Sequence, residues 1–363
     1  MATPDLSAPP ALREPLLQPL LCERGAPGAR RLTGGWAWFN AVLRLERNEF
    51  GEGERRVMSL AEAEAEARAA LGALTAPRAA VLGLSLDRPR IMGVLNATPD
   101  SFSDGGRHLE PERAVEAGLA MLKAGADILD IGGESTRPGA APVSEAEERD
   151  RVLPVIEGLR AAAPEARLSV DTRKAAVAEA AFAAGARLFN DVSALSYDPA
   201  APAAAAALMR ESDAALCLMH AQGDPRTMQD DPRYQDALLD VAAFLQQRLE
   251  RAVAAGAPRE RIVIDPGIGF GKTLAHNIML MDGLGALHSL GAPILLGVSR
   301  KRMIGALSGV EAADRRQHGS VAAALFGAAR GAQILRVHDV AETAEALAVW
   351  MGLGGGAAEF GAA

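Results

Sequence analysis

The sequence predicts an α/β protein whose main part is a (β/α)8 TIM barrel, preceded by a short N-terminal extension of one strand and one helix. From Arg90 onward, short apolar runs alternate with Ala-rich helical stretches eight times, which is the pattern of parallel βα units. These units occupy about 260 residues, the usual size of such a barrel. Polar side chains also follow nearly every apolar run. A doubly wound open sheet is the structural alternative, although it usually contains fewer βα units.

The part of the chain before the barrel divides into two segments. Residues 1–32 are rich in Pro, Ala and Arg, which predicts a poorly ordered arm. Residues 33–88 form the extension, in which Trp36 to Arg47 reads as one strand. Ser59 and Glu62 then form a capping box that opens an Ala/Glu-rich helix. The extension is either a small strand–helix module or a loosely attached segment.

The barrel is expected over residues 89–352, and a flexible Gly/Ala-rich tail follows at 353–363. The predicted strands are, in order, Ile91–Leu95, Asp127–Ile131, Leu168–Val170, Leu188–Phe189, Ala215–Met219, Ile262–Ile264, Ile294–Gly297 and Ile334–Val337. Helices are predicted between them, for example at Pro111–Lys123, Glu145–Ala162, Lys174–Ala184 and Gln235–Ala254.

The composition narrows the class of protein. With 49% apolar and 23% charged residues, the chain is an ordinary globular protein with a sizeable core. A net charge of −8 argues against a nucleic-acid or membrane partner, so a phosphate-bearing substrate would need a local basic site. Cys22 and Cys217 have no metal or disulfide spacing, and the N-terminus lacks the apolar run of a signal peptide. We therefore expect a cytoplasmic protein without a membrane span.

Polar residues stand directly after the predicted strands. Any one of them could simply cap a helix or begin a loop. In a barrel, however, all strand ends converge on the C-terminal face, so the whole set indicates a single site. The residues are Asn96-Ala97-Thr98-Pro99-Asp100, Glu134-Ser135-Thr136-Arg137-Pro138, Asp171-Thr172-Arg173, Asn190-Asp191, His220, Asp265-Pro266-Gly267, Ser299-Arg300-Lys301 and Arg336-Val337-His338.

The residue types in this set suggest what the site binds. Asp171, Asn190 and Asp265 suit a flat heterocycle with an amide edge, since a carboxylate can accept two parallel N–H bonds from a 2-amino-4-oxo ring. Arg336 and His338 lie two apart on a strand and project to the same side, which suits a phosphate. For this pair, a salt bridge to a neighbouring barrel strand is the alternative.

Three Gly-rich or Pro-rich segments lie on the same face. Thr98–His108 and Gly132–Val143 follow the first two strands and are predicted to be lids over the substrate, with ordinary surface connections as the alternative. Gly267–Thr273 (GIGFGKT) resembles a phosphate-binding P-loop, but Pro266 stands where that motif needs glycine. We expect this turn to let the backbone pass close to a ligand instead. No cluster has zinc-site spacing.

Two long motifs resemble a known family. Residues 91–106 (IMGVLNATPDSFSDGG) and 127–140 (DILDIGGESTRPGA) are similar to the first and second signatures of dihydropteroate synthases. Further segments follow in the family's order, and the resemblance covers about Arg90 to Met351, which leaves the N-terminal extension outside it. The resemblance implies a TIM barrel that joins 7,8-dihydropterin-6-ylmethyl diphosphate to p-aminobenzoate, giving 7,8-dihydropteroate and diphosphate in folate biosynthesis. It also implies Mg2+ and a homodimer.

The resemblance also assigns roles to individual residues. Pterin recognition falls to Asp171, Asn190, Asp265 and Lys301. Diphosphate binding falls to Asn96, Arg336 and His338, and Asn96 would also hold the Mg2+. The p-aminobenzoate pocket is implied at Phe102, Ser135, Thr136, Arg137, Pro138, Phe270, Ser299 and Lys301. Asp104 is implied in the closed site, so the catalytic set is Asp104, Lys301, Arg336 and His338.

One position departs from the family pattern, and two other functions are alternatives. Ala221 stands where the family commonly has Met, which predicts a slightly looser pterin pocket wall. Pterin-dependent methyltransferases do not need the 135–138 loop or the Arg336/His338 pair. A non-catalytic pterin-binding protein should have lost such residues. Because the aryl amine is neutral at pH 7, we expect a dissociative reaction that needs no strong general base.

Overall fold

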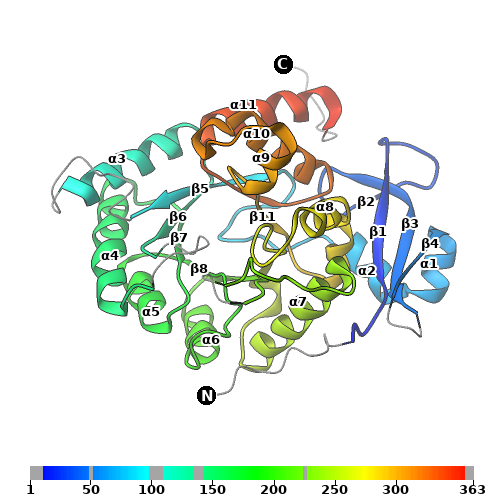
Figure 1. The fold of residues 1–363 in the computed structure, drawn as a ribbon, viewed down its shortest axis with the longest axis horizontal. Coiled ribbons are helices and arrows are strands. Elements are labelled where there is room, and N and C mark those ends of the chain that lie inside the picture. The colour runs from blue at the N-terminus through cyan, green and yellow to red at the C-terminus, as the bar shows by residue number, and fades with distance from the viewer. Residues whose placement is uncertain (1–10, 49–51, 98–108, 135–141, 224–226, 356–363) are drawn as a thin grey trace.

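The computed structural model describes residues 11–48, 52–97, 109–134, 142–223 and 227–355. Figure 1 shows two parts: a barrel surrounded by helices, and a smaller N-terminal module in blue beside it. The barrel strands are β5 (Arg90–Asn96), β6 (Ile128–Gly132), β7 (Leu168–Asp171), β8 (Leu188–Asp191), β9 (Ala215–Met219), β10 (Ile262–Asp265), β11 (Leu295–Gly297) and β12 (Ile334–Val337). Their bounds agree with the predicted runs to within two residues.

The eight strands form a closed parallel barrel. Their order is β10-β9-β8-β7-β6-β5-β12-β11, and every neighbouring pair is parallel. A parallel bridge between Ile264 and Ile294 joins the two ends of this path, and the Ile264 N–H donates to the Pro293 carbonyl at 2.9 Å. The predicted (β/α)8 barrel is therefore confirmed, and the open sheet is excluded.

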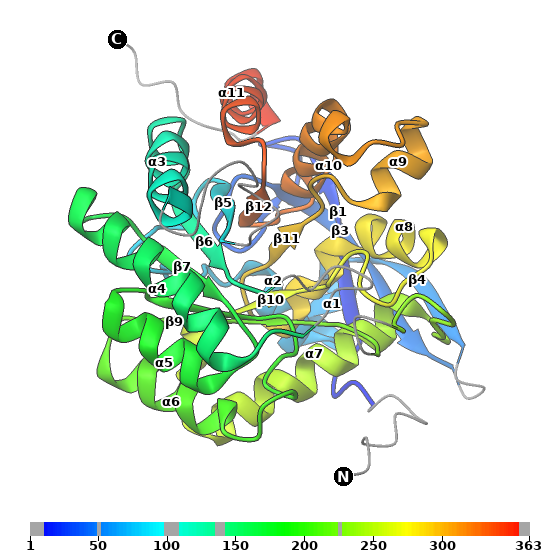
Figure 2. The same ribbon diagram turned by 60° about the vertical axis from the view of Figure 1, so that its left-hand side comes forward.

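Helices follow the strands and enclose the barrel, as the turned view in Figure 2 shows. They are α3 (Leu109–Lys123), α4 (Glu145–Ala162), α5 (Ala175–Ala184), α6 (Ala201–Glu211), α7 (Ala237–Ala254), α8 (Leu274–Asp282), α9 (Arg302–Ser308), α10 (Gln317–Ala329) and α11 (Val340–Trp350). Short 3-10 turns lie at η2 (Arg259–Arg261), η3 (Leu284–Leu290) and η4 (Ala313–Arg315), and a π turn, η5 (Met351–Gly355), follows α11. In the described part of the chain, no helix has both the length and the apolar character needed to span a membrane.

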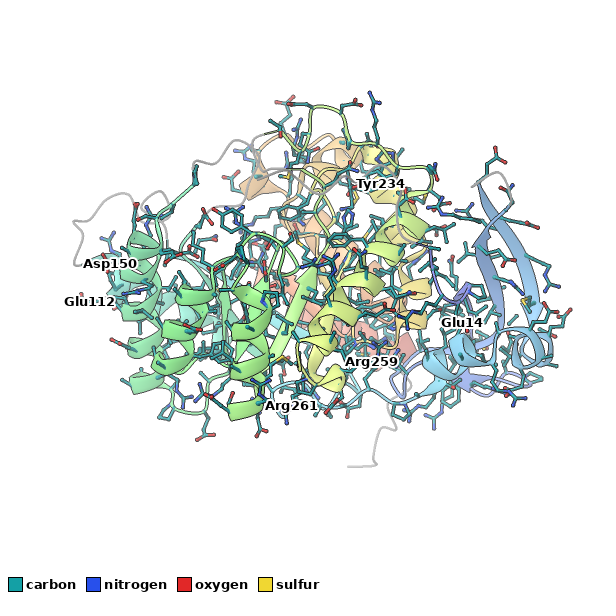
Figure 3. The ribbon with its side chains drawn as sticks, turned by 90° about the horizontal axis from the view of Figure 1, so that it is seen from below. Glu14, Glu112, Asp150, Tyr234, Arg259 and Arg261 are labelled. Carbon is teal, nitrogen blue, oxygen red and sulfur yellow. The ribbon has the colours of Figure 1, made fainter. Side chains whose placement is uncertain are left out.

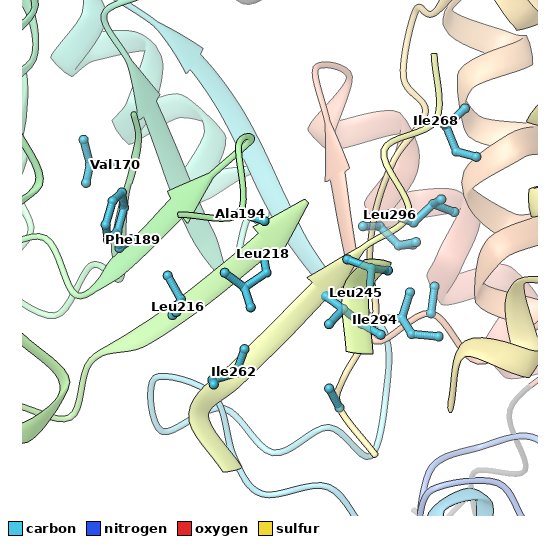
Figure 4. Close-up of a cluster of buried hydrophobic side chains, with 14 of the residues drawn as sticks. Val170, Phe189, Ala194, Leu216, Leu218, Leu245, Ile262, Ile268, Ile294 and Leu296 are labelled. Carbon is cyan, nitrogen blue, oxygen red and sulfur yellow. The ribbon is translucent and has the colours of Figure 1, made fainter. Parts of the chain in front are cut away.

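The strands are apolar on both faces because both faces are covered. The outward side chains pack under the helices, and Figure 4 shows part of this layer with Val170, Phe189 and Leu218. The inward side chains form a separate cluster that includes Met92, Ile128 and Leu188. The segment before β5 adds Val81, Leu84 and Leu86 to this inner cluster. It therefore fills the N-terminal end of the barrel, opposite the strand ends that carry polar residues.

The N-terminal module is larger than predicted. It contains β1 (Leu16–Cys22), β2 (Arg30–Arg31), β3 (Trp38–Arg47), β4 (Gly53–Ser59), α1 (Leu60–Glu66) and α2 (Arg68–Thr75). Strands β1, β2 and β4 each pair antiparallel with β3. The module has its own core, which includes Leu17, Phe39 and Met58. The predicted capping box of Ser59 and Glu62 is confirmed at the start of α1.

The prediction of a poorly ordered arm over 1–32 was wrong for residues 16–22. Leu16 and Leu17 are buried, and β1 pairs with β3 along its length. Pro19 suggested disorder, but β1 is an edge strand, and such a strand tolerates a proline that cannot donate to the ladder. Residues 1–10 and the tail beyond residue 355 lie outside the described residues.

The module is packed against the barrel, so the loosely attached alternative is also wrong. The Leu17 N–H donates to Ser289 Oγ at 2.9 Å, and the buried indole N–H of Trp36 donates to the Ala328 carbonyl at 2.9 Å. Gln333 Nε2 donates to Thr33 Oγ1 at 3.1 Å, and both side chains are buried. These contacts join the module to η3, to the end of α10 and to the start of β12.

Candidate functional site

Strand alternation places the predicted polar residues inside the barrel. Side chains two apart on a strand share a face. Leu188 and Val263 belong to the inner cluster, so Asn190 and Asp265 point inward, one layer nearer the C-terminal end. The same alternation carries Ile334 to Arg336 on β12. The inner apolar layer is thus covered by a polar layer at the end where barrel enzymes build their sites.

Arg336 lies at the centre of this polar layer. Its Nε donates to Asp130 Oδ2 at 2.6 Å, and its NH2 group donates to Asp171 Oδ2 at 2.7 Å. The Asn190 amide also donates to Asp130 Oδ2, at 3.0 Å. Four strands therefore meet in one network. The salt bridge that was the alternative reading of Arg336 is present in the structure, on two carboxylates.

Asp130 is a site residue that the sequence reasoning missed. It is completely buried, and its second oxygen accepts a hydrogen bond from Ser169 Oγ at 2.5 Å. The predicted site contained only residues at or after the strand ends, whereas Asp130 lies in the middle of a strand. The signal was available, because an ionisable residue inside the apolar run ILDIG must have a partner when buried.

Burial dominates the electrostatics of two inward carboxyls, Asp171 and Asp265. Burial raises the pKa of Asp171 to about 7, although the positive charge of Arg336 acts in the opposite direction. Burial likewise raises the pKa of Asp265, against the charge of Lys301. For Arg336, burial acts to lower the pKa, but the charges of Asp130 and Asp171 outweigh it and the pKa is raised. The guanidinium therefore stays charged beside Asp171, whose carboxyl keeps its proton to a higher pH than usual.

Lys301 and Asp265 line the neighbouring side of the site. The Lys301 ammonium donates to the Ile268 carbonyl and lies 4.5 Å from the centroid of the Phe270 ring. Burial lowers the pKa of Lys301 to about 8, although the charge of Asp265 opposes this shift. Gly297 keeps space open here, since a Cβ on it would lie within 3.8 Å of Asp265 Oδ2.

Ser299 and His338 lie together at the ends of β11 and β12. Ser299 Oγ accepts a hydrogen bond from the His338 backbone N–H at 3.2 Å and lies 3.0 Å from His338 Nδ1. Asn96 is the last residue of β5 and is half-buried. The structure therefore places every described residue of the predicted site on the C-terminal face.

Several predicted residues cannot be placed. Those that lie outside the described residues are Phe102, Asp104, Ser135, Thr136, Arg137 and Pro138. The two predicted lids fall largely on the same segments, 98–108 and 135–141. Their assignment therefore stays a prediction.

Some polar residues after the strands hold the scaffold together. Glu134 is buried and pairs with Arg173 at 3.0 Å and with Lys174 at 3.2 Å. Asp191 accepts hydrogen bonds from the backbone N–H groups of Ser193 and Leu195. These side chains order the start of the following helices and loops. This agrees with the alternative that a single polar residue after a strand caps a helix or begins a loop.

The Gly-rich turn lies close to the protein's own backbone. Gly267 has a φ of +65°, and a Cβ on it would overlap the carbonyl oxygen of His220. The glycine is therefore required by close approach to the protein's own backbone. Lys272 is buried and donates to the carbonyls of Gly267 and Phe270 at 2.8 and 2.9 Å. It points into the turn, so this segment does not form a P-loop phosphate site.

Comparison with known proteins identifies the barrel. The model of the family described as "Pterin binding enzyme" matches residues 92–338. A dihydropteroate synthase of Neisseria meningitidis serogroup C is 50% identical over 274 residues, covering 75% of this chain and 95% of its own. That of Escherichia coli strain K12 is 47% identical over 266 residues, covering 73% and 92%.

Solved structures agree. A Xanthomonas albilineans dihydropteroate synthase with 4-aminobenzoic acid matches with a TM-score of 0.70 and 51% identity, covering 74% of this chain and 94% of its own. The Xanthomonas albilineans enzyme in complex with 7,8-dihydropteroate matches with a TM-score of 0.67 and 48% identity, covering 74% and 95%.

Proposed function

The chain belongs to the pterin binding enzyme family, among the dihydropteroate synthases, and from this premise we propose how its polar layer carries out the reaction. The protein is a transferase of folate biosynthesis that joins 7,8-dihydropterin-6-ylmethyl diphosphate to p-aminobenzoate, giving 7,8-dihydropteroate and diphosphate. The reaction breaks the bond between the pterin methylene carbon and the diphosphate oxygen. The aryl amine nitrogen then bonds to that carbon and loses a proton.

The observation that carries this proposal is the network of Arg336 with Asp130 and Asp171. Together with Asn190, it holds two carboxylates, an amide and a guanidinium in fixed positions. We assign the pterin ring to Asp171, Asn190, Asp265 and Lys301. Carboxylates at the floor of the pocket would accept the ring N–H groups, and Gly297 leaves room beside Asp265.

Arg336 and His338 are assigned to the diphosphate. A guanidinium carries several N–H donors, so two carboxylate contacts do not exhaust Arg336. Its charge is secured by Asp130 and Asp171, which keeps a cation at this end of the barrel in an otherwise acidic protein. Fixed positive charge of this kind stabilises the negative charge that grows on the leaving diphosphate.

We also propose Mg2+ as the cofactor, with Asn96 as its protein ligand. Within the described ranges, no group of three or more His, Cys, Asp or Glu side chains could hold a metal ion. Mg2+ suits such a site, because it commonly takes few protein oxygens and completes its shell with substrate phosphates and water. When bound, it would supply further neutralisation of the diphosphate charge.

The amine is assigned to the side of the site formed by Ser299, Lys301 and Phe270. The flat ring of Phe270 and the ammonium above it suit an aromatic carboxylate such as p-aminobenzoate. The aryl amine is neutral at pH 7, so attack needs positioning and exclusion of water more than a strong base. Phe102, Asp104 and the 135–138 residues belong to this assignment as predictions.

The experiment that tests the function is a product assay. Purified protein is incubated with the pterin diphosphate and Mg2+, with and without p-aminobenzoate, and both diphosphate and dihydropteroate are measured. Dihydropteroate that forms only with both amine and metal supports the proposal. Pterin binding without any product would favour a non-catalytic pterin-binding protein. Slow diphosphate release without the amine would support a dissociative step.

We further propose a homodimer in the cytoplasm. Leu274 and Ile278 are exposed one turn apart on α8, and Leu307 and Phe326 are exposed on the neighbouring helices α9 and α10. Exposed apolar side chains on neighbouring helices suit contact with a second copy of the chain. Sedimentation tests it: a wild-type monomer at micromolar concentration would contradict the dimer.

Both cysteines are unpaired, which supports a reducing compartment, and cell fractionation tests that placement.

A further inference from the structure

The edge of the N-terminal module lies against the start of α7. Strand β3 ends at Arg47 and β4 begins at Gly53, so this end of the strand pair carries Arg47, Gly53 and Arg55. The first turn of α7 presents two buried carboxylates, the N-cap Asp236 and, four residues on, Asp240. Each carboxylate pairs with an arginine of the module: Arg55 with Asp236 at 3.1 Å, and Arg47 with Asp240.

The same carboxylates hold the backbone of the chain that leads into α7. Asp236 Oδ1 accepts hydrogen bonds from two backbone N–H groups of the helix, at 3.0 and 3.1 Å. Asp240 Oδ2 accepts from the Gln235 N–H at 2.9 Å, and Arg47 NH1 donates to Gln235 Oε1 at 3.0 Å. Gln235 is therefore held through both its backbone and its side chain by one arginine–carboxylate pair.

Close approach at Gly53 makes this contact tight. A Cβ on Gly53 would lie 2.5 Å from Asp236 Oδ2, well inside van der Waals contact. The backbone of β4 thus packs directly on the carboxylate that begins α7. A buried carboxylate deprived of its cation is costly, so the helix start and the connection before it depend on these arginines.

The connection between β9 and α7 in turn holds both neighbours of Phe270. Tyr234 Oη donates to the Gly271 carbonyl at 2.7 Å, and Gln229 Nε2 donates to the Gly269 carbonyl at 2.6 Å. The ring between them faces the Lys301 ammonium at 4.5 Å. Figure 3 labels Tyr234 beside the upper end of the yellow-green α7, with the blue strands of the module on the other side of this helix.

We propose that Arg47 and Arg55 are positioning residues for the amine-binding side of the site. They act on Phe270 through Asp240, Asp236 and the residues directly before α7, from 227 to 236. The inference rests on the proposed assignment of Phe270 and Lys301 to p-aminobenzoate. It gives the module a function in catalysis that the barrel family does not supply, since the family model begins at Met92 and about a quarter of this chain lies outside the matched relatives.

The proposal predicts different effects on the binding of the two substrates. Asp171, Asn190 and Asp130 lie on β7, β8 and β6, whereas Arg47 and Arg55 contact the start of α7 through Asp240 and Asp236. The contacts of the two arginines lead through the residues before α7 to Phe270 and its flanking glycines, on the proposed amine side. Loss of the two arginines should therefore raise the KM for p-aminobenzoate and leave the KM for the pterin diphosphate and kcat nearly unchanged.

The test uses the full chain with the double substitution R47Q/R55Q. We expect the KM for p-aminobenzoate to rise about fivefold or more, within the range seen for coupling through packed networks. The matched control is Arg13→Gln, which removes another arginine–carboxylate contact between the N-terminal part and α7, that of Arg13 with Glu250 at 2.8 Å, near the far end of the helix. This control should leave both KM values unchanged. Arg55→Lys, which keeps the charge, should recover part of the loss seen for Arg55→Gln.

Other results overturn the inference. An unchanged KM for p-aminobenzoate in R47Q/R55Q, with a wild-type enzyme that makes dihydropteroate, would show that the contacts only attach the module. An equal rise of both KM values would lead to the same conclusion. So would a rise of the KM for p-aminobenzoate in Arg13→Gln that equals the rise in the double variant. If the double variant does not fold, the single variants Arg55→Gln and Gly53→Ala are measured in the same way. A wild-type enzyme without product would instead contradict the proposed function itself.

Discussion

Arg336 Nε lies 2.6 Å from Asp130 Oδ2, and this ion pair joins β12 to β6 inside the barrel. The carboxylate is completely buried, and the arginine side chain is 23% exposed. Because an unpaired charge is expensive in such a place, the pair fixes both the fold of the polar layer and the cation of the proposed diphosphate site.

Asp130→Asn should therefore destabilise the protein strongly. The amide removes the negative charge that Arg336 faces and is a weaker acceptor at the Oδ2 position, to which Arg336 and Asn190 both donate. We expect the free energy of unfolding to fall by about 3 kcal/mol. Urea denaturation measures it. As a control, Asp282→Asn removes an exposed carboxylate 3.2 Å from Arg330 and should change stability by less than about 1 kcal/mol. Similar small changes in both variants would contradict the central role of Asp130.

Asp171 should make stability depend on pH in an unusual direction. Its folded pKa of about 7 lies above the ordinary value of 3.8, because burial disfavours the ionised form. The folded state thus binds the proton more tightly, and this group stabilises the fold at low pH and loses that contribution as the pH rises from about 4 to about 7. Relative to Asp171→Asn, wild-type stability should fall over this window with a slope that approaches about 1.4 kcal/mol per pH unit. A parallel pH dependence of the two proteins would show that the pKa is not raised.

Lys301 should limit the rate at alkaline pH. Burial lowers its pKa to about 8, so the ammonium loses its proton as the pH rises above that value. If the charged form binds substrate, kcat/KM should fall above pH 8, whereas Lys301→Arg should keep its rate, though lower, into the alkaline range because arginine stays charged. An alkaline limb that remains at the same pH in Lys301→Arg would exclude this lysine as its cause.

Gly267→Ala should be far more harmful than another glycine substitution with similar backbone strain. A methyl group on Gly267 would overlap the His220 carbonyl, whereas Gly83, with a φ of +73°, has nothing within 4 Å of the corresponding position. We expect Gly267→Ala to lose at least about 2 kcal/mol more than Gly83→Ala. Thermal melting of both variants checks this. Equal losses would mean that φ alone, and not the close approach, requires glycine at 267.

The barrel was predictable from the sequence because each of its strands is buried on both faces. Runs such as ALCLM at 215–219 are then continuously apolar and end at a polar residue, so their bounds can be read directly. The positions of Asp171, Asn190 and Asp265 at the strand ends were predictable for the same reason. Asp130 was missed because it lies inside a strand, where its need for Arg336 shows only when the strands are brought together.

The N-terminal module was harder to predict because its order depends on distant partners. Strand β1 contains Pro19 and a short run of leucines, and its pairing with β3 and contact with Ser289 are not visible in local sequence. The sequence of the Gly-rich turn is similar to that of a ligand-binding loop. Gly267, however, is required by the close approach of the His220 backbone, which follows the adjacent strand β9.

The most direct test of the proposed site is calorimetric binding of the pterin diphosphate to wild-type protein and to Asp265→Asn, with the exposed Asp213→Asn as control. Removal of a buried carboxylate that accepts ring N–H groups should weaken binding by about tenfold or more, while the control binds like wild type. Unchanged affinity in Asp265→Asn would contradict the assignment of the pterin ring to the inward carboxylates of this barrel.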